Sequence, residues 1–430
     1  MTLVSELQLP AFDYTDASLR GDRFHAAMAE LRREGWLARG PYGYMVLDRE
    51  AGEFFLRTRA ASFPGMKIAE IFGVGEGPLY EQMKRNILHV NGPDHARLRS
   101  LINPALSPRA VERYRPAMRA FLGQLLTDAI ARSPGRAGDA PVRCEFVEAF
   151  ARRFPSQVIA TVMGAPLQDA PRLHHWSNMI QRQFDAASMA DARAEIEQAV
   201  GEFYEYAEAL VRARRSQPGD DLISKLIDAT YADVEAGQAE RLSDVECINL
   251  VFNVLAGGVD TTRSQLAHAV RLLAEHPRQW QLLVADPSLA GAAVEEALRF
   301  EPITPFTARI TSEEVSFRDV RFPAETIVMV CAFTANRDLA ASPPQGEDER
   351  GPDGPDRFDI AAARGRARAL TFGAGVHYCV GANLARVELE EALSFLARRV
   401  RSLELDGQPA FESITGIYGL AELPLSLTLA

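Results

Sequence analysis

The chain has 430 residues, of which 47% are hydrophobic and 24% charged, and a formal net charge of −11. This mixture excludes a disordered chain and a small disulfide-stapled module, because a chain this long buries roughly three quarters of its surface. The negative charge disfavours nonspecific nucleic-acid binding, which needs clustered Lys and Arg. The four cysteines are far apart and form no CxxC pair, so we expect neither a zinc site nor a disulfide framework.

The N-terminal segment lacks the basic start and apolar core of a signal peptide. No stretch reaches about 18 uninterrupted apolar residues, the length needed to span a membrane. We therefore expect a cytoplasmic protein in a reducing compartment, with no membrane and no nucleic acid among its partners.

In chain order, helical spacing predicts a surface helix over 21–37, and a short strand follows at 44–47. Residues 63–93 are irregular and glycine-rich, which favours a substrate loop or, equally, a plain surface loop. The pattern from 94 to 300 is mostly helical. Within it, Ser243 and Glu246 form a capping box that opens a helix reaching about residue 275.

The C-terminal part is more mixed. Residues 304–332 carry short β-like runs, 339–356 form a Pro-, Gly- and acid-rich loop, and a helix is expected from about Cys379 to about Val400. Short strands and turns follow at 403–429. No composition shift marks a linker, so the sequence predicts one domain over 1–430, mainly α with a small β-rich part.

The most informative stretch is FGAGVHYCVG, from Phe372 to Gly381. Gly373 and the second glycine of the loop allow a tight turn before Cys379, which is expected near a helix N-terminus, where free N–H groups favour a thiolate. Gly381 leaves room for a flat, bulky group, Phe372 can cover the sulfur, and His377 can reach an anionic group. These are the requirements of a haem-thiolate site, whereas an isolated cysteine is more often a buried structural thiol.

This stretch resembles the signature F-G-x-G-x-H-x-C-x-G of the cytochrome P-450 family at every fixed position. The resemblance covers about residue 20 to the C-terminus, with 1–19 as an N-terminal extension. It implies the cytochrome P-450 fold, in which the haem lies between a long distal helix and the helix of the cysteine loop. It also implies that Cys379 is the axial ligand of haem b iron, with Phe372, Gly373 and Gly381 beside the cofactor.

The long predicted helix contains AGGVDTT at 256–262. Two adjacent glycines inside a helix cost about 2 kcal/mol relative to alanine, so some function should require them. A glycine-kinked helix with a solvated aspartate is the alternative. The resemblance implies that Gly257 and Gly258 form an oxygen groove, that Thr261 steers protonation of the distal oxygen, and that Asp260 gates proton delivery.

Two charged groups match further family elements. Glu296 and Arg299, at i and i+3, would alone be a surface ion pair, but the resemblance implies a buried structural triad completed by Arg357. His95 and Arg99 share one helix face at i and i+4. The resemblance assigns them, together with two residues later in the chain, to the haem propionates; these two are Arg309 and His377.

The resemblance implies a monooxygenase that activates O₂ and hydroxylates or epoxidises a medium-to-large, mostly apolar molecule, such as those of secondary metabolism. No flavin or iron–sulfur motif is present, so NAD(P)H-derived electrons should arrive through ferredoxin and its reductase, or through flavodoxin. Arg364, Arg366 and Arg368 form either a docking cluster for such a partner or a solvated basic stretch. The family's layout places in the substrate pocket Asn253, Ala256, Thr304, Thr307 and Tyr418.

Two alternatives differ in chemistry. A peroxide-driven haem-thiolate enzyme would not need Asp260 and Thr261, and a haem-binding sensor would give no turnover with any redox partner. A substrate presented on a carrier protein is also compatible with the sequence.

Overall fold

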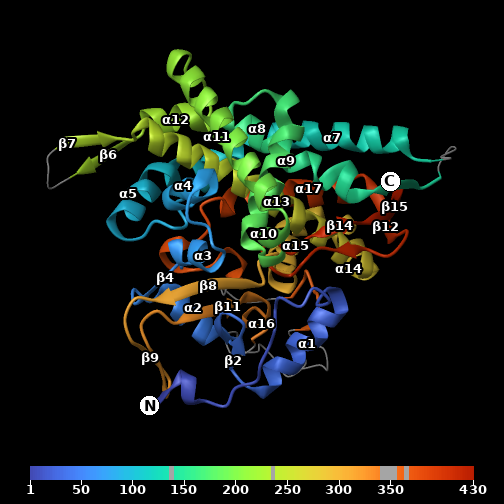
Figure 1. The fold of residues 1–430 in the computed structure, drawn as a ribbon. Helices are drawn as coiled ribbons and strands as arrows, with labels where there is room; N and C mark the ends of the chain where they lie inside the picture. Colours follow the sequence, from blue (N-terminus) through green and yellow to red (C-terminus); the bar gives the residue numbers. More distant parts are fainter. Residues whose placement is uncertain (135–139, 234–237, 339–355, 363–367) are drawn as a thin grey trace.

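The computed structural model describes residues 1–134, 140–233, 238–338, 356–362 and 368–430. Helices make up most of this part of the chain and the strands form small sheets, which confirms the mainly α fold class (Figure 1). Of the predicted loop at 339–356, all but the last residue lies outside the described residues.

The helices and strands have the following bounds. The helices are α1 Gly21–Glu34, α2 Arg49–Arg57, α3 Met66–Ile71, α4 Gly77–Arg85, α5 Gly92–Ile102, α6 Pro108–Val111, α7 Arg115–Arg132, α8 Arg153–Met163, α9 Ala170–Gln181, α10 Ala186–Asp191, α11 Arg193–Ser216, α12 Leu222–Asp228, α13 Asp244–Glu275, α14 Pro277–Ala285, α15 Ala290–Phe300, α16 Ala332–Ala335 and α17 Ala382–Ala397. The strands are β1 Thr2–Leu3, β2 Leu37–Gly40, β3 Gly43–Val46, β4 Ala61–Ser62, β5 Val142–Glu145, β6 Thr230–Asp233, β7 Gln238–Arg241, β8 Phe306–Thr311, β9 Val315–Phe317, β10 Val320–Phe322, β11 Ile327–Cys331, β12 Val400–Leu405, β13 Ala410–Phe411, β14 Leu420–Glu422 and β15 Pro424–Leu429.

Helix α13 forms the centre of the helical part. The predicted capping box is present: the Ser243 hydroxyl accepts from the Glu246 N–H, and the Glu246 carboxylate accepts from the Ser243 N–H at 2.8 Å. The helix is buried along most of its length because α8, α9, α11, α15 and α17 pack around it. Among the described residues, no helix combines the length and the apolar character that crossing a membrane requires.

A five-stranded sheet lies at the other end of the molecule, in the order β2-β3-β11-β8-β4 (Figure 1). Strands β3 and β11 are parallel and the other pairs are antiparallel, and Arg309 on β8 stands opposite Val328 on β11. The N-terminal residues join this end of the molecule through β1, which pairs with β10.

The C-terminal strands close the remaining side. Strand β15 lies between β12 and β5, and the short pair β13–β14 holds a loop, residues 412–419, that returns toward α13. We call this segment the hairpin loop. The predicted short strands at 403–429 are therefore confirmed, and they place the hairpin loop next to the distal helix.

One local expectation was wrong. The stretch 63–93 is not a long irregular loop, because it contains α3 and α4 and the start of α5. Its glycines Gly65, Gly73 and Gly77, all at positive φ, lie at the helix ends and not inside the helices. The helix expected from about Cys379 to about Val400 is present as α17, which begins at Ala382, three residues beyond Cys379.

Candidate active site

One cavity of about 470 Å³ separates α13 from the cysteine loop. Its lining is mainly apolar and comes from segments far apart in the sequence, including Phe63, Phe252, Met329 and Leu384. Most of the site residues predicted from the sequence meet in this cavity; they are His95, Arg99, Asn253, Ala256, Gly257, Gly258, Thr261, Thr304, Thr307, Arg309, Phe372, Gly373, His377, Cys379 and Gly381.

The Cys379 sulfur lies deep in the protein and is nevertheless accessible, because it faces the cavity. Burial raises the pKa of the thiol, while hydrogen bonds from the N–H groups of Gly381 and Ala382 and the charge of Arg99 oppose the rise. None of the other three cysteines lines the cavity. The alternative of a buried structural thiol therefore does not fit Cys379.

The turn before Cys379 depends on glycine. Gly373 and Gly375 both have positive φ, at +69° and +72°, and a Cβ on Gly375 would overlap the carbonyl oxygen of Leu56. The Cys379 N–H donates to the Phe372 carbonyl at 2.9 Å and closes the loop. At Gly381 a Cβ would meet only the Cys379 sulfur within 4 Å, so this side of the cavity stays open.

A cluster of basic side chains lies at one side of the cavity. The rings of His95 and His377 are 4.2 Å apart, and Arg99 and Arg309 line the same space. Burial lowers the pKa of Arg309 to about 10 and that of His377 to about 3, with His95 and Arg309 adding to the effect on His377. In the described part of the chain, neither Arg99 nor Arg309 has a carboxylate partner within 4 Å, so the cluster lacks an anion.

The opposite wall is α13, where Gly257 opens onto the cavity. A Cβ at Gly257 would meet no atom within 4 Å, whereas one at Gly258 would overlap the Ile159 side chain on α8. The Thr261 hydroxyl donates to the Gly257 carbonyl at 2.5 Å. The two glycines therefore serve different purposes, one leaving space in the cavity and the other allowing close packing of α8.

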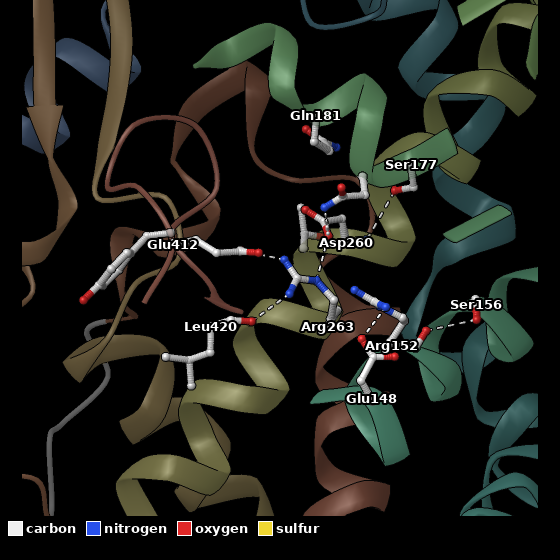
Figure 2. Close-up of polar contacts among 12 residues, drawn as sticks. Glu148, Arg152, Ser156, Ser177, Gln181, Asp260, Arg263, Glu412 and Leu420 are labelled. Atoms are coloured by element: carbon white, nitrogen blue, oxygen red, sulfur yellow. Dashed lines mark hydrogen bonds and ion pairs between the residues drawn. The ribbon is translucent and has the colours of Figure 1, made fainter. Parts of the chain in front are cut away.

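Helix α9 contacts α13 at the same place. The Ser177 hydroxyl donates to the Ala256 carbonyl at 2.6 Å and accepts from the Asp260 N–H at 3.3 Å, so it bridges two backbone groups that bond to each other in a regular helix. The Gln181 amide also donates to Ala256, at 3.0 Å. Figure 2 shows these side chains beside Asp260. No sequence pattern points to Ser177 and Gln181, because both lie on an ordinary amphipathic helix.

Asp260 does not line the cavity but lies behind the Thr261 wall. Its carboxylate accepts from the Asn178 amide at 3.1 Å and from Arg263 Nε at 2.7 Å. Burial raises the pKa of this carboxyl, but the Arg263 charge and both hydrogen bonds outweigh burial and lower it. The aspartate is therefore ionised and paired, and the solvated alternative is excluded.

Haem fits these residues. A sulfur with two backbone N–H donors faces the cavity from one side, Gly257 leaves the other side open, and unpaired basic groups stand where two propionates would need partners. The family model described as "Cytochrome P450" matches residues 69–286 and 281–414. The chain belongs to the cytochrome P450 family.

Known cytochromes P450 resemble the chain along most of its length. Luteothin monooxygenase of Streptomyces thioluteus is 33% identical over 418 residues, which cover 97% of this chain and 96% of that protein. Mycinamicin IV hydroxylase/epoxidase of Micromonospora griseorubida is 34% identical over 328 residues, covering 76% and 75%. The structure of P450BioI in complex with a hexadec-9Z-enoic acid ligated acyl carrier protein superposes with a TM-score of 0.80 at 26% identity, covering 94% and 98%. The chain is accordingly a P450 oxidoreductase, and its family implies a haem-iron cofactor.

Two predicted positions differ from the structure. Tyr418 does not line the cavity: it is fully buried, its hydroxyl accepts from the Gly21 N–H at 2.9 Å, and its ring stacks on Phe411. The preceding residues of the hairpin loop, 414–417, line the cavity instead. Tyr418 differs from residues 414–417 because the backbone turns away from the cavity and into the core at residue 418.

The second difference concerns the structural triad. Arg299 binds Glu296 through two hydrogen bonds of 2.7 and 2.8 Å, both side chains buried, as expected. Arg357, however, joins through its backbone carbonyl, which accepts from Arg299 at 2.9 Å, while its side chain is 60% exposed and turned toward Asp359. Of the predicted basic cluster, Arg368 is exposed, and Arg364 and Arg366 lie outside the described residues.

Glu388 is a cavity residue that the sequence reasoning missed. It lies on α17, is 1% exposed, and neither carboxylate oxygen has a hydrogen-bond partner in the described structure. Burial raises the pKa of this carboxyl well above its usual value. Nothing in its local sequence distinguishes it from the other acidic residues of the helix.

Proposed function

We propose that this cytochrome P450 hydroxylates or epoxidises a medium-to-large, mostly apolar small molecule, with haem b bound through Cys379. The cavity supports this proposal, because its apolar lining extends well past the space between Cys379 and Gly257 to α3, β8 and the hairpin loop. The names of the two enzymes compared above, a luteothin monooxygenase and a mycinamicin IV hydroxylase/epoxidase, point to secondary metabolism. The lining draws on residues from Tyr14 to Ile417, which favours one domain over 1–430.

Bound haem supplies the activation of O₂, of which one atom enters the substrate and the other leaves as water. The chain's own residues hold and protect this chemistry. Cys379 would bind the iron as a thiolate, with the N–H groups of Gly381 and Ala382 donating to its sulfur, and the cluster His95, Arg99, Arg309 and His377 would bind the propionates. Phe372 and Gly373 complete the wall beside the sulfur.

The protons enter from the α13 side. The Thr261 hydroxyl, fixed by Gly257, holds a proton position at the cavity wall, and Asp260 behind it is the acid that passes protons inward. Asn253, Thr304 and Thr307 are the polar groups that orient the substrate, and Ala256 keeps the wall beside them flat. The pairing of Asp260 and Thr261 favours O₂ over peroxide as the oxidant.

Electrons come from separate proteins, because the chain carries no flavin or iron–sulfur motif. Ferredoxin with its reductase, or flavodoxin, has the required chemistry. The exposed Arg368, just before the cysteine loop, offers a positive contact for an acidic partner.

The test is a titration of the ferric protein with a library of apolar compounds, followed by the Soret band. A ligand that expels the axial water moves the band to shorter wavelength, and its turnover with NAD(P)H, ferredoxin and reductase should give a product labelled from ¹⁸O₂. Turnover with peroxide, but none with NAD(P)H, ferredoxin and reductase, would contradict the proposal, and absence of product under both conditions would identify a sensor. If only a carrier-bound form of a compound shifts the band, the substrate is delivered on a carrier protein.

A further inference from the structure

Arg263 is a fully buried arginine whose guanidinium connects α13 to the C-terminal hairpin. Its Nε donates to Asp260 at 2.7 Å, one terminal nitrogen donates to the Leu420 carbonyl at 2.9 Å, and the other donates to the Glu412 carboxylate at 2.7 Å. Figure 2 shows the guanidinium between the two carboxylates. Asp260 and Glu412 therefore share one cation, although one belongs to the distal helix and the other to the hairpin loop.

The two carboxylates differ in their surroundings. The Asp260 side chain is 3% exposed, whereas that of Glu412 is 30% exposed and reaches the boundary with solvent. Besides Arg263, the ionisable group that acts electrostatically on Asp260 is His174 on α9. Burial lowers the pKa of His174 to about 4, so its ring is neutral at pH 7. In the described structure, Arg263 is thus the cation that holds the Asp260 carboxylate in place.

The residues around the guanidinium leave no spare room. A Cβ at Gly419 would overlap the Glu412 carboxylate and lie 3.2 Å from a terminal nitrogen of Arg263. The Glu412 N–H donates to the Gly419 carbonyl at 2.9 Å and closes the hairpin loop behind the ion pair. The loop cannot move as a unit without moving Glu412.

The same loop forms part of the cavity wall. Residues 414–417 lie between Glu412 and Gly419 and line the cavity, and Thr415 is tied by its hydroxyl to Asp185 at the start of α10. The cavity lining and the ion pair with Arg263 therefore belong to one loop.

We propose that Arg263 is a positioning residue that links the substrate-facing hairpin loop to Asp260, so that contact with the substrate sets how firmly Asp260 is held. With the loop in place, Glu412 draws part of the Arg263 charge away from Asp260. When the Glu412 charge is lost, Arg263 pairs with Asp260 alone and retains it more strongly. The inference rests on the proposed role of Asp260 as the proton gate.

The connection between Asp260 and the hairpin loop through Arg263 is tested first by hydrogen–deuterium exchange on the full-length, haem-loaded protein, without substrate. Asp260→Asn removes one of the two carboxylates at a site whose side chain does not touch the hairpin loop, so Arg263 pairs with Glu412 alone. We expect exchange of the amides of 412–419 to slow at least twofold. Unchanged exchange in this segment, with changes confined to α9 and α13, would overturn the link. Glu412→Gln should accelerate exchange there, and an effect no larger than that of the control Glu422→Gln would also count against it.

The consequence for proton delivery is tested by the solvent isotope effect on NAD(P)H consumption, with dodecanoic acid as probe and ferredoxin and reductase as electron source. Glu412→Gln should slow consumption severalfold and raise the ratio of rates in H₂O and D₂O. Glu422→Gln alters the charge of the same hairpin by the same amount on the exposed strand β14 and should leave the ratio unchanged. An isotope effect in Glu412→Gln equal to that of the wild type would refute the functional part of the inference.

The two measurements separate the possible failures. If Asp260→Asn itself leaves the isotope effect unchanged, the proposed role of Asp260 fails, while the exchange data still decide whether Arg263 joins the two segments. Glu412→Gln retains the shape of the side chain and the buried Arg263, so it serves where substitution of Arg263 prevents folding.

Discussion

The hydroxyl of Thr261 donates a 2.5 Å hydrogen bond to the carbonyl of Gly257, one turn earlier on α13. The hydroxyl proton is therefore used in the hydrogen bond to the Gly257 carbonyl. The lone pairs of the hydroxyl oxygen remain available to accept a hydrogen bond from a donor in the cavity. A threonine held in this way can stabilise a water or a proton next to bound O₂ without moving its side chain.

Thr261→Ala removes this hydroxyl and retains the helix. Because proton delivery to the distal oxygen then lacks its fixed acceptor, we expect a severalfold rise in hydrogen peroxide released per NAD(P)H consumed. Thr261→Ser keeps the hydroxyl and should stay near the wild-type ratio. Equal peroxide yields in the alanine variant and the wild type would show that Thr261 does not steer protonation.

Gly375→Ala should destabilise the cysteine loop. A positive φ costs a non-glycine residue about 1–2 kcal/mol, and here the new Cβ would also overlap the backbone of Leu56. Gly73→Ala is the matched control, since Gly73 also has positive φ, at +64°, but its Cβ would meet no atom within 4 Å. We expect a larger fall in thermal midpoint and in haem content for Gly375→Ala, and similar losses in both variants would argue against the close approach.

The free energy of unfolding should depend on pH in part through His268. Burial lowers the pKa of His268 to about 3, and one ring nitrogen lies 3.2 Å from the Tyr418 carbonyl oxygen. The unfolded chain takes up this proton below about pH 6.5 and the folded protein does not, so stability is complete above that pH and is lost as the pH falls toward 3.

A single such group contributes a slope of about 1.4 kcal/mol per pH unit in this window. Between pH 6.5 and 5, above the range in which ordinary carboxylates titrate, His268→Gln should unfold with a pH slope smaller by about one proton. Identical slopes in the wild type and His268→Gln would contradict the assignment.

The cysteine loop and α13 could be predicted because their local patterns are dense. The capping box at Ser243, the glycines before Cys379 and the spacing of His95 and Arg99 are each readable within a few residues, and the structure brings them to one cavity or helix face as expected. Local patterns do not show which distant segments lie together. The family resemblance supplied this, because it implies that α13 and the cysteine loop face each other.

The missed features depend on how segments far apart in the chain pack together. Ser177 meets Ala256, Glu412 meets Arg263, and Glu388 enters the cavity wall, none of which leaves a mark on the nearby sequence. The family's layout predicts Tyr418 in the pocket, but the structure buries its side chain in the core, one residue after the loop segment that lines the cavity. Side-chain direction at a loop exit depends on tertiary packing, which a sequence pattern does not encode.

The central claim is that Cys379 is the thiolate ligand of the haem iron, and the spectrum of the reduced carbon monoxide complex tests it most directly. Cys379→Ser should lose the thiolate-type Soret band, while Cys144→Ser, at a half-buried cysteine outside the cavity, should keep it. A thiolate-type band retained in Cys379→Ser would show that the iron is bound elsewhere and would contradict the account.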